Sequence, residues 1–145
     1  MKNSKKQVIG RRVKVTILRL GIKGVFAKVD SGAFRSAIHC SSVREVSKDG
    51  KKYLKVVFDK HDKLHSTQPV ILEKYHKVKV RNTSGIDQIR FAVITPVIIK
   101  GKNLETIFTF ADRQAMTWPI LLGRKVLKGN FVIDVDYGIM PDEEF

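Results

Sequence analysis

Apolar and polar residues alternate along most of the chain in short runs. A period of two places successive side chains on opposite faces of a β-strand, and β-branched and aromatic residues favour that conformation. Such runs, some alternating and some more uniformly apolar, occur at residues 12–18, 25–29, 36–46, 53–58, 75–81, 88–99, 104–110 and 131–135. Many short strands separated by regularly spaced turns predict an all-β barrel or sandwich.

The segments between these runs carry turn signals. Turns that contain glycine are predicted at 20–24, 48–50, 82–85 and 101–103. Near the end of the chain, the apolar run 120–123 leads into a short basic helix at 124–128, which Gly129-Asn130 terminates. Residues 59–68 are polar and rich in histidine without periodicity, so we expect a loop there. The predicted fold is therefore all-β with one short C-terminal helix.

Length and composition indicate how many domains the chain forms and in which compartment we expect it. The 145 residues are 43% hydrophobic and show no linker or strong repeat, so we expect a single domain over 1–145 with flexible ends at 1–7 and 141–145. The longest apolar run, 91–99, is too short to span a membrane, and the basic N-terminus lacks the apolar segment of a secretory signal. The single cysteine, Cys40, excludes an internal disulfide and suits a reducing compartment. We expect a cytoplasmic protein with no membrane contact.

The net charge of +14 is unevenly distributed. Residues 1–90 hold 22 basic and 7 acidic side chains, a balance of +15, whereas the remainder of the chain is near neutral. This asymmetry predicts a polyanionic partner, either an acidic polypeptide or a nucleic acid, although a solvated basic surface would give the same count. Lys77, Lys79 and Arg81 alternate with valines and are candidate substrate contacts, but any half-buried strand shows this pattern.

The candidate chemistry begins at Asp30. The apolar run 25–29 ends in Asp30-Ser31-Gly32-Ala33, which places a carboxylate at the end of a predicted buried strand, just before a glycine turn. A carboxylate in such surroundings can act as a general acid or base. The triplet alone also fits a simple Asx or Ser turn at the end of a strand.

Metal and nucleotide sites have weaker support. His61 and His65 have the i, i+4 spacing of zinc ligands, but their segment is poor in helix formers and lacks a His-Glu-x-x-His motif. His39 and Cys40 are adjacent on a predicted strand and should point to opposite faces, and Gly101-Lys102 lacks the other residues of a phosphate loop. We therefore expect no metal and no cofactor.

A second motif changes the interpretation of Asp30. The segment 118–124 contains Leu121-Leu122-Gly123-Arg124 directly before the predicted helix. Together with Asp30-Ser31-Gly32-Ala33, in this order and with flap-like strands between, it resembles the retropepsin-like aspartic proteases. The closer resemblance is to a bacterial branch labelled ATP-dependent zinc protease, and it extends over nearly the whole chain. Ser31 stands where Thr is more usual, Phe34 where a polar or basic residue is usual, and Cys40 where a small residue is usual.

The resemblance implies a retropepsin-like acid-protease barrel with Asp30 as the catalytic residue. Because the chain holds one Asp-Ser-Gly, a catalytic dyad would need a homodimer that brings two Asp30 carboxylates together. Ser31 would hydrogen-bond the carboxylate, and Gly32 and Ala33 would leave space for the substrate. Leu122, Gly123 and Arg124 would pack beside the site. Asp112 is an alternative partner within one chain, although Arg113 and Arg124 favour a structural ion pair for it.

The same branch is linked with ATP-grasp ligases that add glutamates to proteins, which makes an acidic or glutamate-extended protein the expected substrate. Nucleic acid is the less favoured partner. The alternative is a non-catalytic adaptor of the same fold that binds an acidic protein or RNA, because fold alone does not determine function.

Overall fold

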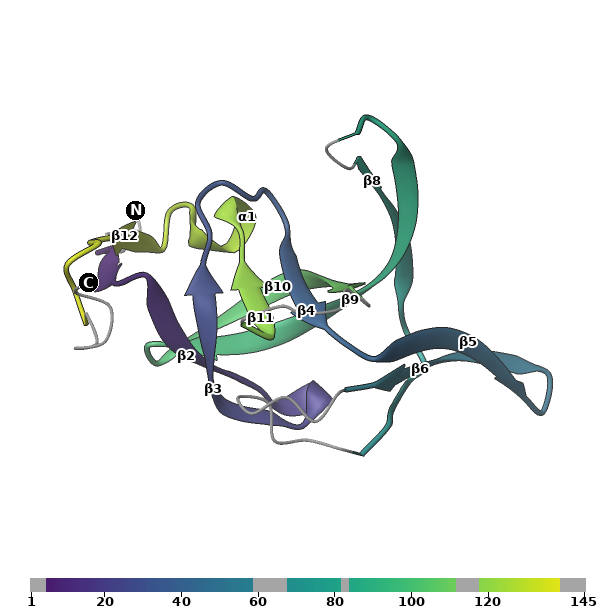
Figure 1. Cartoon of the computed structure of the whole chain (residues 1–145). Coiled ribbons are helices and arrows are strands. Elements are labelled where there is room, and N and C mark those ends of the chain that lie inside the picture. Colours follow the sequence, from purple (N-terminus) through teal and green to yellow (C-terminus); the bar gives the residue numbers. More distant parts are fainter. Residues whose placement is uncertain (1–4, 59–67, 82–83, 112–117, 139–145) are drawn as a thin grey trace.

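Six strands of the chain close into a β-barrel, as the computed structural model shows for residues 5–58, 68–81, 84–111 and 118–138 (Figure 1). The ring runs in the order β10-β4-β11-β3-β2-β9, and β9 pairs with β10 to close it. The barrel strands are β2 (Arg12–Ile17), β3 (Ile22–Val29), β4 (Ser36–His39), β9 (Asp87–Ile99), β10 (Lys102–Ala111) and β11 (Ile120–Leu122). The predicted all-β barrel with one short helix, α1 (Arg124–Leu127), is confirmed.

Three further groups of strands are attached to the barrel. Strand β8 (His76–Arg81) pairs with β9 to form a hairpin that rises beyond the barrel (Figure 1). Strands β5 (Ser42–Lys48), β6 (Lys51–Val57) and β7 (Val70–Leu72) form a separate three-stranded sheet. Strands β1 (Gln7–Ile9) and β12 (Phe131–Ile133) pair in parallel, so Gln7 belongs to a strand although the sequence placed it in the terminal segment.

The barrel interior explains why alternation identified the strands. Val13, Val15 and Ile17 of β2 are buried, while the residues between them face outward or lie at the surface. The longest strand, β9, repeats this pattern, with Val97 and Ile99 fully buried and Pro96 and Ile98 exposed. Burial of apolar side chains at about 25 cal/mol per Å² is the main stabilising term of such a core.

Two of the turns predicted from glycine, at 48–50 and 101–103, can be compared with the backbone angles of the structure. Asp49 and Gly50 both have positive φ, 52° and 78°, as the tight turn between β5 and β6 requires, so the turn predicted at 48–50 is confirmed. The hairpin of β9 and β10 turns at Lys100 and Gly101, with φ of 51° and 77°, earlier than the predicted 101–103. Lys102 already pairs with Ile99 in the β9–β10 ladder, and this long pairing decides the position of the turn.

Other boundaries also differ from the prediction. The expected turn at 20–24 is wrong in its second half, because β3 begins at Ile22 and a 3-10 helix, Leu18–Leu20, makes the turn before it. Gly24 lies inside β3 with a φ of 59°, next to an irregularity in the pairing of β2 with β3. This glycine therefore occupies a distortion within the strand and not a turn. The expected extended run 36–46 is two strands, β4 and β5. The predicted loop 59–68 and the end 141–145 lie almost wholly outside the described residues.

No helix in the described ranges is long and apolar enough to cross a membrane.

Candidate active site

Asp30 follows directly after β3, and the barrel fixes its main chain. Strand β3 pairs in parallel with β11, with Val29 opposite Leu122. The Asp30 amide continues this ladder by donating a hydrogen bond to the Leu122 carbonyl oxygen at 2.9 Å. The Ala33 amide then donates to the Asp30 carbonyl oxygen at 3.2 Å, which closes the turn. The carboxylate is therefore carried by a turn that is closed by its own hydrogen bond and anchored at Asp30 to strand β11.

The Asp30 carboxylate is oriented by the glycine of its own turn. The Gly32 amide donates a hydrogen bond to Asp30 Oδ1 at 3.0 Å, and the side chain is half-buried. The sequence assigned this supporting bond to the Ser31 hydroxyl, but in the described part of the chain no hydrogen bond joins that hydroxyl to Asp30. The main chain takes this role because an Asx-type turn brings the amide two residues later to the carboxylate. Ser31 instead lines the cavity beside the turn.

The end of β11 and the start of α1 hydrogen-bond to this turn. The Arg124 amide donates to the Ala33 carbonyl oxygen at 2.8 Å, and the Lys125 amide donates to the Phe34 carbonyl oxygen at 3.1 Å. The Arg124 guanidinium reaches back, and its Nη1 donates to the Ser31 carbonyl oxygen at 2.9 Å. The first turn of α1 thus satisfies three carbonyl groups of the Asp30 loop.

Gly123 is required at its position by close contact with the main chain. A Cβ atom added there would lie 2.5 Å from the Arg35 carbonyl oxygen and 2.7 Å from the Phe34 carbonyl oxygen. The Gly123 amide also donates to Ser36 Oγ at 3.0 Å, and Ser36 is almost fully buried. Sequence reasoning missed Ser36, because a buried hydroxyl at the start of a strand leaves no mark in the alternation pattern.

A cavity of about 600 Å³ opens beside the Asp30 turn. Its walls combine apolar side chains, among them the exposed Phe34, with the cationic side chains at and after the start of α1. The lining residues are Ser31, Phe34, Arg124, Lys125, Leu127, Lys128, Phe131 and Ile133. Phe34, which departs from the residue usual in the resembling branch, gives this cavity an aromatic wall. An apolar group next to an anionic one would fit such surroundings.

The three cations predicted as substrate contacts lie on β8, and two of them have partners. Lys77 Nζ lies 3.3 Å from Glu45 Oε1, and Arg81 Nε lies 3.2 Å from Asp87 Oδ1 across the hairpin. Lys79 is exposed and forms no ion pair within the described ranges. Lys77 and Arg81 are therefore partly neutralised within the chain, and Lys79 is the cation of this set with the full charge available.

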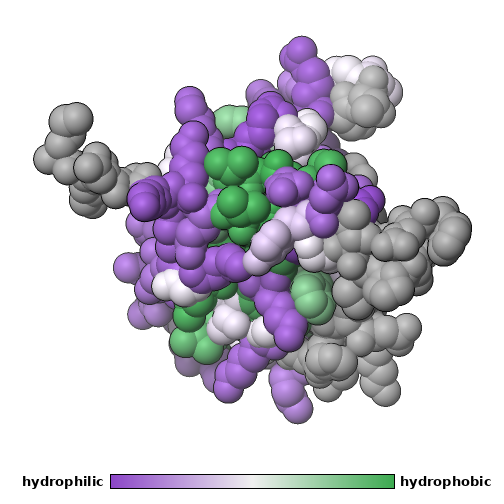
Figure 2. Space-filling view, turned by 90° about the vertical axis from the view of Figure 1, so that its left-hand side faces the viewer, coloured by the Kyte–Doolittle hydropathy of each residue, from purple (hydrophilic) through white to green (hydrophobic). Residues whose placement is uncertain are grey.

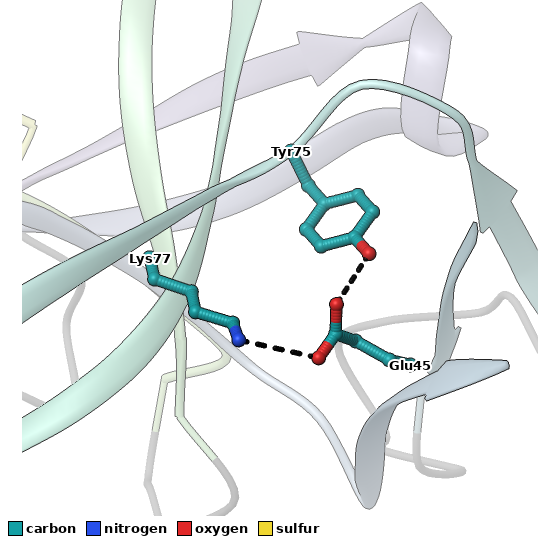
Figure 3. A network of polar contacts seen from close by, with 3 residues as sticks. All are labelled: Glu45, Tyr75 and Lys77. Atoms are coloured by element: carbon teal, nitrogen blue, oxygen red, sulfur yellow. Dashed lines mark hydrogen bonds and ion pairs between the residues drawn. The ribbon is translucent and has the colours of Figure 1, made fainter. Parts of the chain in front are cut away.

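Glu45 joins the three-stranded sheet to the base of the β8–β9 hairpin (Figure 3). Tyr75 Oη donates a hydrogen bond to Glu45 Oε2 at 2.6 Å. This hydrogen bond lowers the pKa of the Glu45 carboxyl below its ordinary value of 4.5, Lys77 acts in the same direction, and the Glu45 contact raises the pKa of Tyr75 above 10.0. The sequence did not suggest this network, because Glu45 and Tyr75 come from separate predicted strands.

The alternative catalytic and metal residues are only partly described. Asp112 and the His61/His65 pair lie outside the described residues, so their roles stay predictions. His39 and Cys40 are both buried at the end of β4. Within the described ranges, no three His, Cys, Asp or Glu side chains gather closely enough to hold a metal ion.

A closed six-stranded barrel, with an Asp-Ser-Gly turn backed by a Gly-Arg segment, defines the retropepsin-like class of fold. Residues 8–142 match the family described as "Retropepsin-like aspartic endopeptidase RimB", and the chain belongs to this family.

Curated relatives carry a different name. A "Probable alpha-L-glutamate ligase" of Desulfotalea psychrophila is 29% identical over 134 residues, which cover 89% of this chain and 28% of the relative. A protein with the same name from Shewanella pealeana is 26% identical over 144 residues, covering 97% of this chain and 30% of the relative. The chain thus spans less than a third of the length of these relatives.

A solved structure agrees with the fold. Lpg0085 of Legionella pneumophila, a protein with unknown function, superposes with a TM-score of 0.69 over 91% of this chain and 95% of that chain. Its sequence identity is 22%, so it supports the architecture alone.

Proposed function

We propose that the protein is an aspartic-type peptidase in which Asp30 works with the Asp30 of a second copy, on an acidic or glutamate-extended protein. The observation that carries the proposal is the Asp30 turn itself. Its carboxylate is held by the Gly32 amide at 3.0 Å, beside a cavity of about 600 Å³. Membership of the aspartic endopeptidase family supports the same chemistry.

The chemistry needs two carboxylates. When two carboxyl groups lie close together they share one proton, because both cannot easily be ionised. The ionised group takes a proton from the attacking water, and the protonated group donates to the carbonyl oxygen of the scissile bond. The chain has one Asp-Ser-Gly turn, so a two-fold axis that brings the two turns together would complete the pair.

An apolar face supports association between two copies. Apolar side chains gather on the face seen from the left of Figure 1, where β1 and β12 lie, within a hydrophilic surround (Figure 2). These strands expose Val8 and Val132 at 42% and 49% of their surface. Strand β12 also contributes Phe131 and Ile133 to the cavity beside the Asp30 turn. A partner placed here would cover these side chains and approach the turn.

The nature of the substrate rests on charge and on the relatives. A net charge of +14 favours an acidic chain over a neutral one. The curated relatives contain a segment like this chain within proteins named glutamate ligase, which associates the domain with glutamate chemistry. A peptidase that trims glutamate-extended proteins would act on the product of such a ligase.

The test compares Asp30→Asn with Asp49→Asn, which makes the same chemical change in the turn between β5 and β6. Both are incubated with a model protein that carries an added glutamate tail, and products are identified by mass spectrometry. We expect cleavage by wild type and Asp49→Asn but not by Asp30→Asn, with all three equally folded by thermal unfolding. Cleavage by Asp30→Asn at the wild-type rate would contradict the proposal. Tight binding of the tail without cleavage by any of the three would favour the adaptor alternative.

A further inference from the structure

The three-stranded sheet β5-β6-β7 has one face on the core and one face in solvent. Leu54, Val56 and Leu72 are buried, and they lie on the face that packs against the barrel core. The alternation of β6 therefore turns Tyr53, Lys55 and Val57 to the other face. Figure 1 shows the β5–β6 hairpin extending away from the barrel, so its outer part has solvent around it.

Two pairs of like charges lie directly across this solvent face. Arg44 of β5 is opposite Lys55 of β6, and Lys48 is opposite Lys51. Directly opposed side chains in an antiparallel pair have Cβ atoms about 5 Å apart, where like charges destabilise the sheet. None of the four cations forms an ion pair in the part of the chain that the structure describes. Glu45, the acid of β5, lies on the opposite face, where Tyr75 and Lys77 bind it (Figure 3).

Strand β5 also presents an open edge. The sheet order is β5-β6-β7, so the outer backbone groups of β5 pair with no strand within the described ranges. Exposed edge strands can template the addition of another strand, and cationic side chains on an edge keep most strands away. An acidic strand is the exception, because it would place carboxylates beside Arg44 and Lys48 and relieve the repulsion across the pair.

We infer that the open edge of β5, together with the cations Arg44, Lys48, Lys51 and Lys55, binds an acidic polypeptide segment in extended conformation as a fourth strand. Arg44 and Lys48 are four residues apart, which is about 13 Å along a strand. The added strand would therefore carry acidic side chains at positions i and i+4. Between them, position i+2 would lie beside Val46 and Tyr53, which face the same side, and an apolar side chain suits it.

A polypeptide fits this surface better than a nucleic acid. A single-stranded nucleic acid binds by stacking its bases on exposed aromatic side chains among cations. This face offers Tyr53 alone, and it is partly buried. A nucleic acid would also leave the hydrogen-bonding edge of β5 unused, whereas an extended peptide satisfies both the edge and the charges. The inference concerns binding only and does not depend on cleavage at Asp30.

The experiment uses the full chain with Asp30→Asn, so that a cleavable probe stays intact. The probe is a fluorescent peptide that repeats Glu-Thr-Val-Thr, which puts glutamate at every fourth position and valine midway. Its control is a peptide of the same composition with the glutamates adjacent. We expect the patterned peptide to bind more tightly in fluorescence anisotropy. Arg44→Ser with Lys48→Ser should weaken it about tenfold, since two exposed charge pairs contribute a factor of about this size.

The matched control removes two cations from the barrel instead, Lys14→Ser with Lys23→Ser, and should leave the affinity nearly unchanged. Both double variants lose the same net charge. An equal loss of affinity for the peptide in both would therefore show general electrostatic attraction and overturn the inference. The β5 double variant removes repulsion across the hairpin, so its thermal midpoint should not fall.

Backbone pairing is tested separately. A strand donates amides alternately to its two sides, so N-methylation of alternate residues blocks one edge and keeps the charge. Of two peptides methylated on opposite sets, one should bind and the other should lose most of its affinity. Equal binding by both would exclude strand addition. Displacement of the probe by single-stranded RNA of equal charge, with both methylated peptides binding equally, would assign the surface to nucleic acid.

Discussion

Gly123→Ala isolates the contact that positions the Asp30 turn. The Gly123 backbone has φ −90° and ψ 177°, an extended conformation that alanine adopts without strain. In the unfolded chain the added methyl reduces conformational freedom, which favours the alanine variant by about 0.4–1 kcal/mol. Backbone preference alone would therefore make the variant slightly more stable than wild type.

Contact with the main chain reverses that sign. The new Cβ would lie 2.5 Å from the Arg35 carbonyl oxygen and 2.7 Å from the Phe34 carbonyl oxygen, so main chain must move. Overpacking of this kind costs about 1–3 kcal/mol. The movement also weakens the bonds that the amides of residues 123, 124 and 125 donate to Ser36, Ala33 and Phe34, at about 0.5–1.5 kcal/mol each. Less the unfolded-state gain, these costs give a net loss of about 1.5–7 kcal/mol in the free energy of unfolding, with the upper end reached only where all three bonds are lost.

Chemical denaturation measures this loss, and the cleavage assay measures its consequence for the turn. Gly101→Ala is the control, because its φ is 77° with no atom within 4 Å of the added Cβ. It should lose about 1–2 kcal/mol through backbone strain alone and keep its cleavage rate. Gly123→Ala should lose cleavage activity even under conditions in which the protein is fully folded. A Gly123→Ala protein as stable and as active as wild type would refute the packing argument.

Two further predictions address the association and the Glu45 network. If activity needs two Asp30 carboxylates, a ninefold excess of Asp30→Asn should reduce the activity per wild-type chain to about a tenth by random pairing, and unchanged activity would exclude the shared pair. Glu45 has a lowered pKa, so its contribution to stability is fully present above the ordinary pKa of 4.5 and is lost as the pH falls through the lowered pKa. Tyr75 has a raised pKa, so its contribution is fully present below the ordinary pKa of 10.0 and is lost as the pH rises through the raised pKa. Thermal midpoints of wild type and Tyr75→Phe should therefore differ most between pH 5 and 9 and converge outside it, and a constant difference would show that the network does not titrate.

The strands could be predicted because local alternation records which side of a strand is buried. Residues 12–17 and 88–99 owe their pattern to the barrel interior, and the sequence located both. The turn at Asp49 and Gly50 was equally predictable, since its chemistry is local. The position of the Lys100-Gly101 turn was not, because the long pairing of β9 with β10 determines it and pairing is a property of two segments.

The candidate site, like the fold, could be predicted from the sequence only in part. The residues Asp30 and Gly123 stand out through their motifs, and the structure places them in one hydrogen-bonded unit. The hydrogen bond from the Gly32 amide to the carboxylate could not be predicted, because every residue except proline has such an amide and only the conformation of the turn decides which one reaches the carboxylate. Ser36 and Glu45 were missed because their partners lie 87 and 30 residues away.

The register of the β5–β6 hairpin decides which side chains of β5 face inward and which face solvent. Glu45 faces inward, where it meets Tyr75 and Lys77, and its neighbours Arg44 and Lys48 face outward. A shift of one residue would exchange the faces, since side chains alternate with a period of two. Cations would then meet Lys77 at the base of the β8–β9 hairpin, and the acid would face solvent. The Asp49-Gly50 turn prevents this, because its two positive φ angles fix a two-residue connection and with it the register. The sharp turn therefore determines which face of β5 packs inward as the anchor to the hairpin and which face carries the proposed acid-binding surface into solvent.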